Sequence, residues 1–188
     1  MSDAPNPYVL PADLPVPVDD GAAGHLEGMT LPALALPSTS GADIDLAGAS
    51  AGTLVLYLYP RTGRPGESLP EGWDEIPGAR GCTPQSCAFR DHFGELRALG
   101  ADVLGLSAQS LPDQMEFAQR VGLPYPILSD PELELAGSLR LPTFEVAGMR
   151  LYRRLTLIAR GGRVAKVFYP VFPPDRNAAD VVAWMESP

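Results

Sequence analysis

Hydrophobic positions fall into runs along this chain that predict the strands of a sheet. Residues 53–59 form an unbroken apolar run of strand length, which is typical of a central strand buried on both faces. Residues 101–108 predict a second buried strand. Residues 29–46 alternate apolar and polar positions between prolines and a glycine, which predicts a short edge hairpin. Residues 154–170 predict two strands around the turn at Gly161–Gly162.

Apolar residues spaced three or four positions apart predict helices between and after these strands. The first helix begins at Thr83 and ends at Gly100, and further helices are expected over residues 110–122, 131–141 (a weaker pattern) and 175–187. Residues 125–130 fit a short strand or an extended loop. The apolar faces of the first and last helices consist of Phe89, Phe93, Leu96 and Leu99, and of Val181, Val182, Trp184 and Met185.

Strands that alternate with helices predict an α/β fold with a parallel core, and the final hairpin adds an antiparallel edge. The expected architecture is thioredoxin-like: a central mixed β-sheet flanked by helices, with an N-terminal β-hairpin extension. Residues 1–24, rich in proline, aspartate and small residues, predict an arm that is either loose or laid across the surface of a domain over 25–188. The loop 61–80 has many prolines and glycines and no periodicity, and loops of this length are often functional.

Length and charge narrow the possible functions. A chain of 188 residues with 45% hydrophobic residues is expected to form one compact domain. Its net charge of −9 argues against binding to nucleic acids or to an anionic membrane surface. The sequence has no apolar run near the roughly 18 residues of a membrane span, and its start has no basic or apolar signal, so we expect a cytoplasmic protein.

The only two cysteines, Cys82 and Cys87, lie close together in the sequence. In a reducing compartment such a pair is more often catalytic, redox-sensing or metal-binding than structural. Cys82 lies where the loop ends and the helix begins, and a helix N-terminus favours the thiolate, which is the nucleophilic form. Positive charge from Arg80, Arg90 or Arg154 would add to this effect.

Helix geometry separates the alternatives for this pair. Two helical residues five positions apart have Cα atoms about 8.6 Å apart, beyond the roughly 7 Å limit for a disulfide. If Cys82 and Cys87 are both helical, they form a poor staple and a plausible redox couple that bonds only when the turn unwinds. A metal site with His92 is disfavoured because the three side chains would diverge. A further hypothesis that stays open is that both cysteines are inert, with Cys87 a small core residue on its helix.

Several segments, taken in order, resemble those of the peroxiredoxins (the AhpC/TSA superfamily), most closely the Q-type or bacterioferritin-comigratory-protein group. The resemblance runs from about Gly28 to the C-terminus. The segments that carry it read GMTLPALALPSTSG, LYLYP, GCTPQSC, LGLSAQS, LPYPILSD and RRLTLIARGGRV.

The resemblance implies a role for each residue of the site. Cys82 would be the peroxidatic cysteine that attacks the peroxide, and Cys87 the resolving cysteine that forms an intrachain disulfide with it. Thioredoxin or a similar dithiol donor would then reduce this disulfide. Arg154 would hold the thiolate and polarise the peroxide, with backbone N–H groups near Gly81 and Cys82 as further donors. The resemblance implies no cofactor, no metal and a monomer.

The chain departs from the family pattern immediately before Cys82. The family has a threonine three residues before this cysteine, and here that residue is Ala79. Residues 61–79 look like an insertion that separates Tyr59–Pro60 from the cysteine. We expect Pro60 to cover the site, Tyr59 to belong to its wall or to the core, and Thr62 to fold back as the replacement hydroxyl.

The remaining candidate residues are expected to have structural rather than catalytic roles, or to lie at the margin of the site. Gln109 and Ala159 stand where the family usually has aspartate. Arg80 is a secondary site candidate that more often would be a solvated loop charge. Trp73 is expected to anchor the loop rather than cover the pocket, Trp184 to lie in the core, and His25 and His92 to lie on the surface.

Three functions are compatible with these residues. The first is a peroxidase for hydrogen peroxide and organic hydroperoxides that uses the Cys82–Cys87 disulfide in every turnover. The second is a redox sensor in which the same disulfide alters partner binding without useful turnover. The third is a noncatalytic relative with a permanent disulfide.

Overall fold

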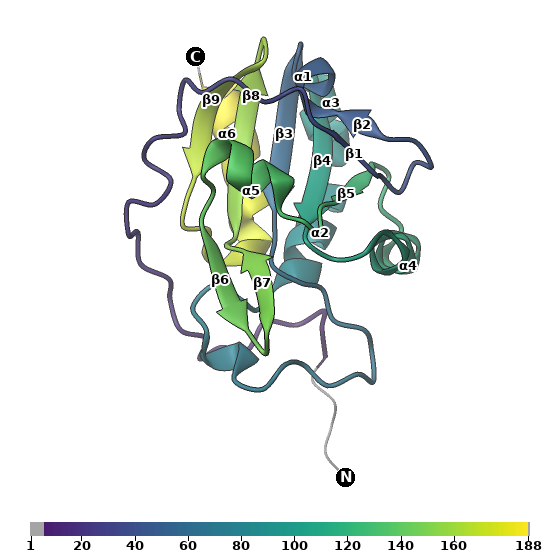
Figure 1. Ribbon diagram of the computed structural model, residues 1–188, viewed down its shortest axis with the longest axis vertical. Helices are drawn as coiled ribbons and strands as arrows, with labels where there is room; N and C mark the ends of the chain where they lie inside the picture. The colour runs from purple at the N-terminus through teal and green to yellow at the C-terminus, as the bar shows by residue number, and fades with distance from the viewer. Residues whose placement is uncertain (1–5, 188) are drawn as a thin grey trace.

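A mixed five-stranded sheet with the order β5-β4-β3-β8-β9 forms the centre of the molecule in the computed structural model, which describes residues 6–187 (Figure 1). Neighbours β3, β4 and β5 pair in parallel, whereas β8 and β9 run antiparallel. This arrangement confirms the predicted parallel core with an antiparallel edge. The strands span Thr53–Leu58 (β3), Ala101–Ser107 (β4), Ile127–Ser129 (β5), Leu155–Arg160 (β8) and Arg163–Phe168 (β9).

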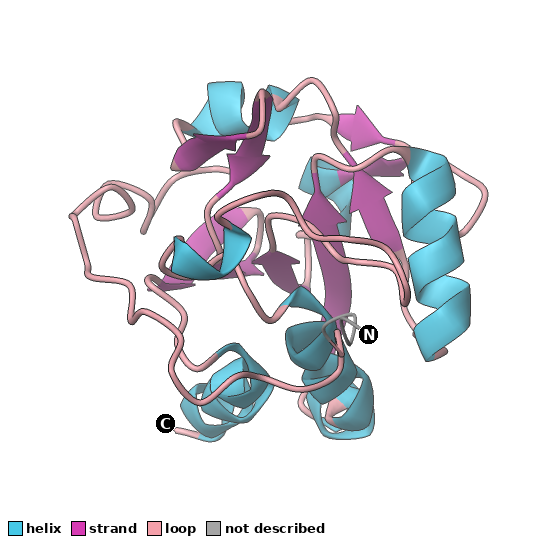
Figure 2. Ribbon diagram, turned by 90° about the horizontal axis from the view of Figure 1, so that it is seen from below, coloured by secondary structure: helices cyan, strands magenta, loops and turns pink. Residues whose placement is uncertain are grey.

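Helices and loop segments cover both faces of the sheet and create a hydrophobic cluster on each. One cluster contains residues of α2, α3, α4 and α6, and the other contains residues of α1, α5 and the segment 23–36. Figure 1 shows α5 in front of the sheet and α2 and α6 behind it, and Figure 2 shows the helices on that rear side seen from below. The helices span Leu46–Ala49 (α1), Cys82–Asp91 (α2), Phe93–Ala98 (α3), Leu111–Val121 (α4), Glu134–Leu139 (α5) and Asn177–Glu186 (α6).

The central strand β3 supplies both clusters, because successive side chains of a strand point to opposite faces. Leu54 and Leu56 belong to one cluster and Val55 and Tyr57 to the other, and none of these side chains is exposed. Burial on both faces explains why this segment is apolar throughout rather than alternating.

The helix predicted over residues 83–99 is in fact two helices. It begins at Cys82, and His92, with φ −92° and ψ 3°, ends α2 before α3 starts. Because the helix is interrupted at His92, the apolar face predicted from one continuous helix does not extend to the end of α3. Leu99 is therefore exposed instead of buried. The expectation that Trp184 lies in the core is also wrong: it is half-buried, with Arg160 stacked 5.0 Å from its ring centroid.

Two hairpins lie outside the main sheet. The predicted N-terminal hairpin is present but short, with β1 (Ala35–Leu36) paired to β2 (Ile44–Asp45). The second hairpin, β6 (Thr143–Val146) with β7 (Met149–Tyr152), was not expected from the sequence. Short 3₁₀ turns at Trp73–Glu75 (η1) and Pro174–Arg176 (η2) complete the described elements.

The N-terminal arm lies across the surface over residues 6–24, and residues 1–5 fall outside the described part of the chain. Arg120 on α4 donates to the hydroxyl of Tyr8 at 3.0 Å, and Tyr169 donates to Asp20 at 2.9 Å. Within residues 6–187, no helix is long and apolar enough to cross a membrane.

Gly105→Ala should destabilise the sheet. A Cβ atom at this position of β4 would lie 2.6 Å from Ile127 Cγ2 and 2.8 Å from the ring of Tyr57. Overpacking of this kind costs about 1–3 kcal/mol of unfolding free energy, to be measured by urea denaturation. Gly94→Ala on α3 is the matched control, because nothing lies within 4 Å of its Cβ position and alanine favours a helix by up to about 1 kcal/mol. Equal stability of the two variants would contradict this packing.

Candidate active site

Cys82 is the first residue of α2, and its side chain is buried. The chain enters the helix through Gly81, whose φ of 102° is a backbone conformation that favours glycine. A Cβ atom on Gly81 would lie 2.4 Å from Pro174 and 2.7 Å from Leu10. The tight approach of these two segments therefore requires glycine directly before the cysteine.

Arg154 brings a positive charge to Cys82 from the opposite side of the site. Its Nη2 atom donates to Cys82 Sγ at 3.2 Å, and the side chain is only 4% exposed. The guanidinium also donates to the backbone carbonyls of Gly78, Ala79 and Arg80 at 3.1–3.3 Å. Carbonyl groups hold the guanidinium without neutralising it, and no carboxylate of residues 6–187 forms an ion pair with it. The free charge is thus directed at the sulfur.

The position of Arg154 follows from the register of the sheet. Leu58 at the end of β3 pairs with Leu155 at the start of β8. Arg154 therefore lies at the end of the sheet at which β3 finishes and the long loop begins. The sequence identified this arginine from its motif, and the structure brings it into contact with Cys82.

A buried polar chain fixes the orientation of Arg154. Its Nη1 donates to Gln85 Oε1, and Gln85 Nε2 donates to Asn177 Oδ1 at 3.0 Å. Thr156 on β8 donates to the same Asn177 oxygen at 2.7 Å. Sequence reasoning missed these partners, although Gln85 follows Cys82 by about one helical turn and could have been found by that spacing.

Cys87 lies on the same helix as Cys82, and both thiols are free. Positions five apart in a helix place their Cα atoms about 8.6 Å apart, so the fold as described is that of a reduced pair. Partial burial raises the pKa of the Cys87 thiol, and the nearby charge of Arg90 opposes this rise. Cys82 and Cys87 thus differ in surroundings, since only Cys82 has a guanidinium in contact with its sulfur.

A small pocket of about 20 Å³ opens beside Cys82. The start of α2, the loop 61–80 and Pro7 of the arm line it. A volume of this size accommodates a molecule not much larger than water. Arg80 also lines the pocket and is 8% exposed, with Nη1 2.8 Å from Asp74 Oδ1, so it is not the solvated loop charge that is common at such positions.

Thr62 returns to the pocket, as expected, but its hydroxyl bonds elsewhere. It donates to Gln109 Oε1 at 3.1 Å, and the Thr62 N–H donates to the same oxygen at 2.8 Å. At the family's usual threonine position, Ala79 offers only its carbonyl, which lies 3.6 Å from Cys82 Sγ. Gln109 thus engages the hydroxyl of Thr62, which therefore does not serve as the expected replacement hydroxyl at Cys82.

The remaining candidates lie around this centre. Pro60 is buried, and Tyr59 belongs to the same hydrophobic cluster as Cys82, with its hydroxyl donating to Gln114 at 2.7 Å. Neither residue lines the small pocket. His92 ends α2 beside Glu95, and His25 contacts the carbonyl of Leu139. No cluster of potential metal ligands occurs anywhere in the described residues.

Comparison with known proteins identifies relatives of this chain. The family model for Redoxin matches residues 26–182. "Peroxiredoxin Q, chloroplastic" from Suaeda salsa is 29% identical over 86% of this chain and 68% of its own length, and the protein of the same name from Gentiana triflora is 26% identical over 94% and 76%.

Solved structures show the same fold. Peroxidoxin BcpB from Mycobacterium tuberculosis superposes with a TM-score of 0.69 at 25% identity, over 86% of this chain and 97% of that one. Peroxiredoxin Q from Xanthomonas campestris superposes with a TM-score of 0.63 at 21% identity, over 93% and 97%. The thioredoxin-like fold predicted from the sequence is thereby confirmed.

The raised pKa of the Cys87 thiol predicts slow labelling of this residue at neutral pH. Burial favours the neutral thiol, so the pH midpoint for iodoacetamide labelling should be higher in the folded protein than in urea. The measurement uses Cys82→Ser, in which Cys87 is the only thiol, with labelling followed by mass spectrometry. A folded-state midpoint equal to or below that of the unfolded chain would contradict the described environment.

Proposed function

The chain belongs to the redoxin family and is an enzyme of the Q-type peroxiredoxins, and we propose that it reduces peroxides through Cys82, Cys87 and Arg154. The single observation that supports this assignment best is the contact of 3.2 Å between Arg154 Nη2 and Cys82 Sγ. It pairs a nucleophile with a fixed cation at a helix N-terminus, inside a pocket that admits a small molecule.

The first step is attack of the Cys82 thiolate on the terminal oxygen of the peroxide. A sulfur–oxygen bond forms, the oxygen–oxygen bond breaks, and the leaving oxygen takes up a proton to become water or an alcohol. Arg154 and the free N–H groups at the start of α2 stabilise the negative charge that moves from sulfur to oxygen. Cys82 is left as a sulfenic acid.

The second step joins Cys82 to Cys87. The Cys87 sulfur attacks the sulfenic sulfur, a disulfide forms and water leaves. Because both residues belong to α2, the turn between them has to unwind before their Cα atoms come within about 7 Å. Partial burial raises the pKa of the Cys87 thiol, so this form of α2 favours the neutral thiol at Cys87.

The third step returns the enzyme to its starting state. A dithiol donor such as thioredoxin attacks the disulfide, and after two thiol exchanges the donor carries the disulfide and both cysteines are thiols again. Hydrogen peroxide and organic hydroperoxides are the proposed substrates. A resolving cysteine within the chain needs no second subunit, which supports a monomer. The need for a reducing donor supports a cytoplasmic location, although the plant relatives are named as chloroplastic.

A redox sensor is the second candidate, because the same unwinding would change the surface around α2. The two functions differ in turnover. An enzyme consumes many equivalents of peroxide with thioredoxin and its reductase, whereas a sensor is oxidised once per molecule. The narrow pocket at Cys82 and the fixed Arg154 favour the enzyme, because both serve the reaction with peroxide rather than partner binding.

Substitution of each cysteine should separate their roles. Cys82→Ser should abolish peroxide consumption, because the nucleophile is lost. Cys87→Ser should retain one rapid oxidation but lose thioredoxin-driven turnover by at least about 100-fold, with Cys82 then passing to the sulfinic state. Stopped-flow oxidation, a coupled thioredoxin assay and intact mass spectrometry measure these outcomes. Normal thioredoxin-driven turnover of Cys87→Ser would rule out its resolving role.

A further inference from the structure

The loop 61–80 is tied to helix α4 at its first half. Arg64 Nη2 lies 2.8 Å from Asp113 Oδ1, and Arg64 Nε lies 3.6 Å from Glu116 Oε2. Arg120 pairs with Glu116 at 2.7 Å and donates through Nη2 to the carbonyl of Gly63 at 3.0 Å. Two arginines and two carboxylates thus hold this part of the loop against one helix.

The second half of the loop has a small hydrophobic cluster of its own. Trp73 is 3% exposed, and its ring centroid lies 6.2 Å from that of Phe144 on β6. The cluster joins the loop to the unexpected β6–β7 hairpin; its buried members are Trp73, Ala79, Val146 and Leu151. Trp73 therefore anchors the loop, as expected from the sequence, and it also lines the pocket beside Cys82.

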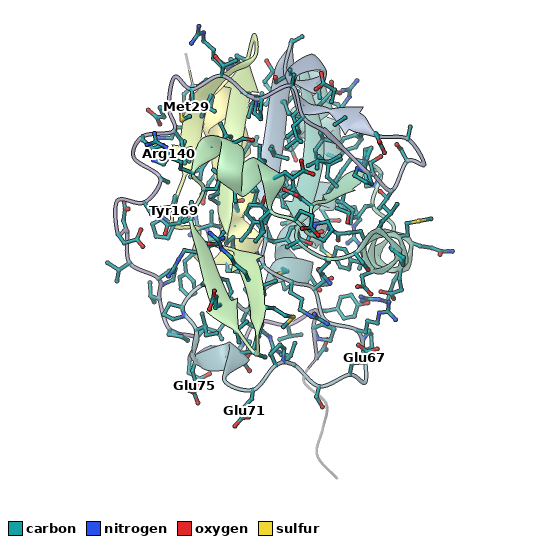
Figure 3. All side chains as sticks on the ribbon, viewed as in Figure 1. Met29, Glu67, Glu71, Glu75, Arg140 and Tyr169 are labelled. Atoms are coloured by element: carbon teal, nitrogen blue, oxygen red, sulfur yellow. The ribbon has the colours of Figure 1, made fainter. Side chains whose placement is uncertain are left out.

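Further contacts hold each end of the loop in place. Thr62 is bonded to Gln109 through both its N–H and its hydroxyl, and Arg80 is paired with Asp74 within the loop. Figure 3 labels Glu67, Glu71 and Glu75 at the end of the molecule where Figure 1 shows the loop 61–80. All three glutamates are exposed, and Glu67 also lines the pocket beside Cys82.

This loop also supplies most of the wall of the pocket at Cys82. The contributing residues are Arg61, Thr62, Gly63, Arg64, Glu67, Leu69, Trp73 and Arg80. The anchors that hold the loop therefore also hold the pocket at about 20 Å³. Hydrogen peroxide fits the space beside the sulfur, whereas the larger phenyl and methyl groups of cumene hydroperoxide would have to extend past the loop residues that line this partly open pocket.

We propose that the loop 61–80 is an anchored lid that makes the enzyme selective for small peroxides and excludes bulky aromatic or tertiary hydroperoxides. This inference rests on the proposed peroxidase function and narrows its substrate class. Residues Arg64 and Trp73 determine the selectivity, because the first fixes the lid to α4 and the second fixes it to the β6–β7 hairpin.

The first variant of the test loosens the lid from outside the pocket, and the second removes a side chain that lines it. Asp113→Asn/Glu116→Gln removes the two charged partners of Arg64 on α4 while preserving side-chain size, and leaves in place Glu67, whose Oε1 lies 4.0 Å from Arg64 Nη1 within the loop. Each exposed ion pair contributes up to about 1 kcal/mol, so kcat/KM for cumene hydroperoxide relative to hydrogen peroxide should rise about 3- to 10-fold. The rate with hydrogen peroxide should stay within about 2-fold of the wild type. Trp73→Ala should raise the ratio further, by at least about 10-fold.

Two controls make the comparison specific. Arg97→Gln breaks the ion pair with Asp102 at a place that does not line the pocket, and should leave the ratio unchanged. Alkylation of Cys82 in a Cys87→Ser background measures access without any peroxide. In this background, the lid substitutions should raise the rate of alkylation by a bulky pyrene maleimide, relative to the rate with iodoacetamide, by a similar factor. Far-UV circular dichroism establishes that each variant is folded.

The outcomes separate the lid from the peroxidase function. Increases in both the peroxide ratio and the alkylation ratio would support the lid. An unchanged alkylation ratio in both folded lid variants would overturn it, whatever the peroxidase activity. If the wild type reduces no peroxide but the lid variants still admit the bulky maleimide, the proposed function fails and the lid stands as a gate to Cys82.

Discussion

The contact between the Arg154 guanidinium and the Cys82 sulfur is the interaction on which the rest of the site depends. The central sheet positions Arg154, which directly precedes β8. The N-terminus of α2 positions Cys82. Backbone carbonyls of residues 78–80 and the amide of Gln85 hold the guanidinium in place. Since none of these partners carries a negative charge, the positive charge remains available to the sulfur and to the oxygen that receives its electrons.

The same helix must be ordered for the first reaction and locally unfolded for the second. In the folded form, Ser86 lies between the two cysteines and is held by tyrosines of the core: Tyr57 donates to its hydroxyl at 3.1 Å and Tyr125 to its carbonyl at 3.0 Å. Burial raises the pKa of both tyrosines, which keeps their hydroxyl groups protonated as donors. These bonds oppose unwinding of the turn that disulfide formation requires, so the resolving step works against the packing that creates the nucleophile.

Local patterns predicted most of the fold and the reacting residues, whereas contacts distant in sequence did not follow from them. Apolar runs identified β3 and β4, and the position of Cys82 after a loop identified the reactive end of α2. The β6–β7 hairpin was missed because its strands are short and pack mainly against the inserted loop. Asn177 joins the site because α6 packs beside α2 and β8, where Gln85 and Thr156 donate to its side chain, and the hydroxyl of Thr62 donates to Gln109. No spacing in the sequence encodes either contact.

Replacement of Arg154 tests the central interaction most directly. The rate at which a single equivalent of hydrogen peroxide oxidises Cys82 can be followed by stopped-flow fluorescence in Arg154→Gln and in Arg153→Gln, whose arginine adjoins Arg154 but does not line the small pocket. The account predicts that Arg154→Gln slows oxidation by about 10²- to 10³-fold, while Arg153→Gln stays within about 3-fold of the wild type. Equal oxidation rates for the folded Arg154→Gln variant and the wild type would contradict it.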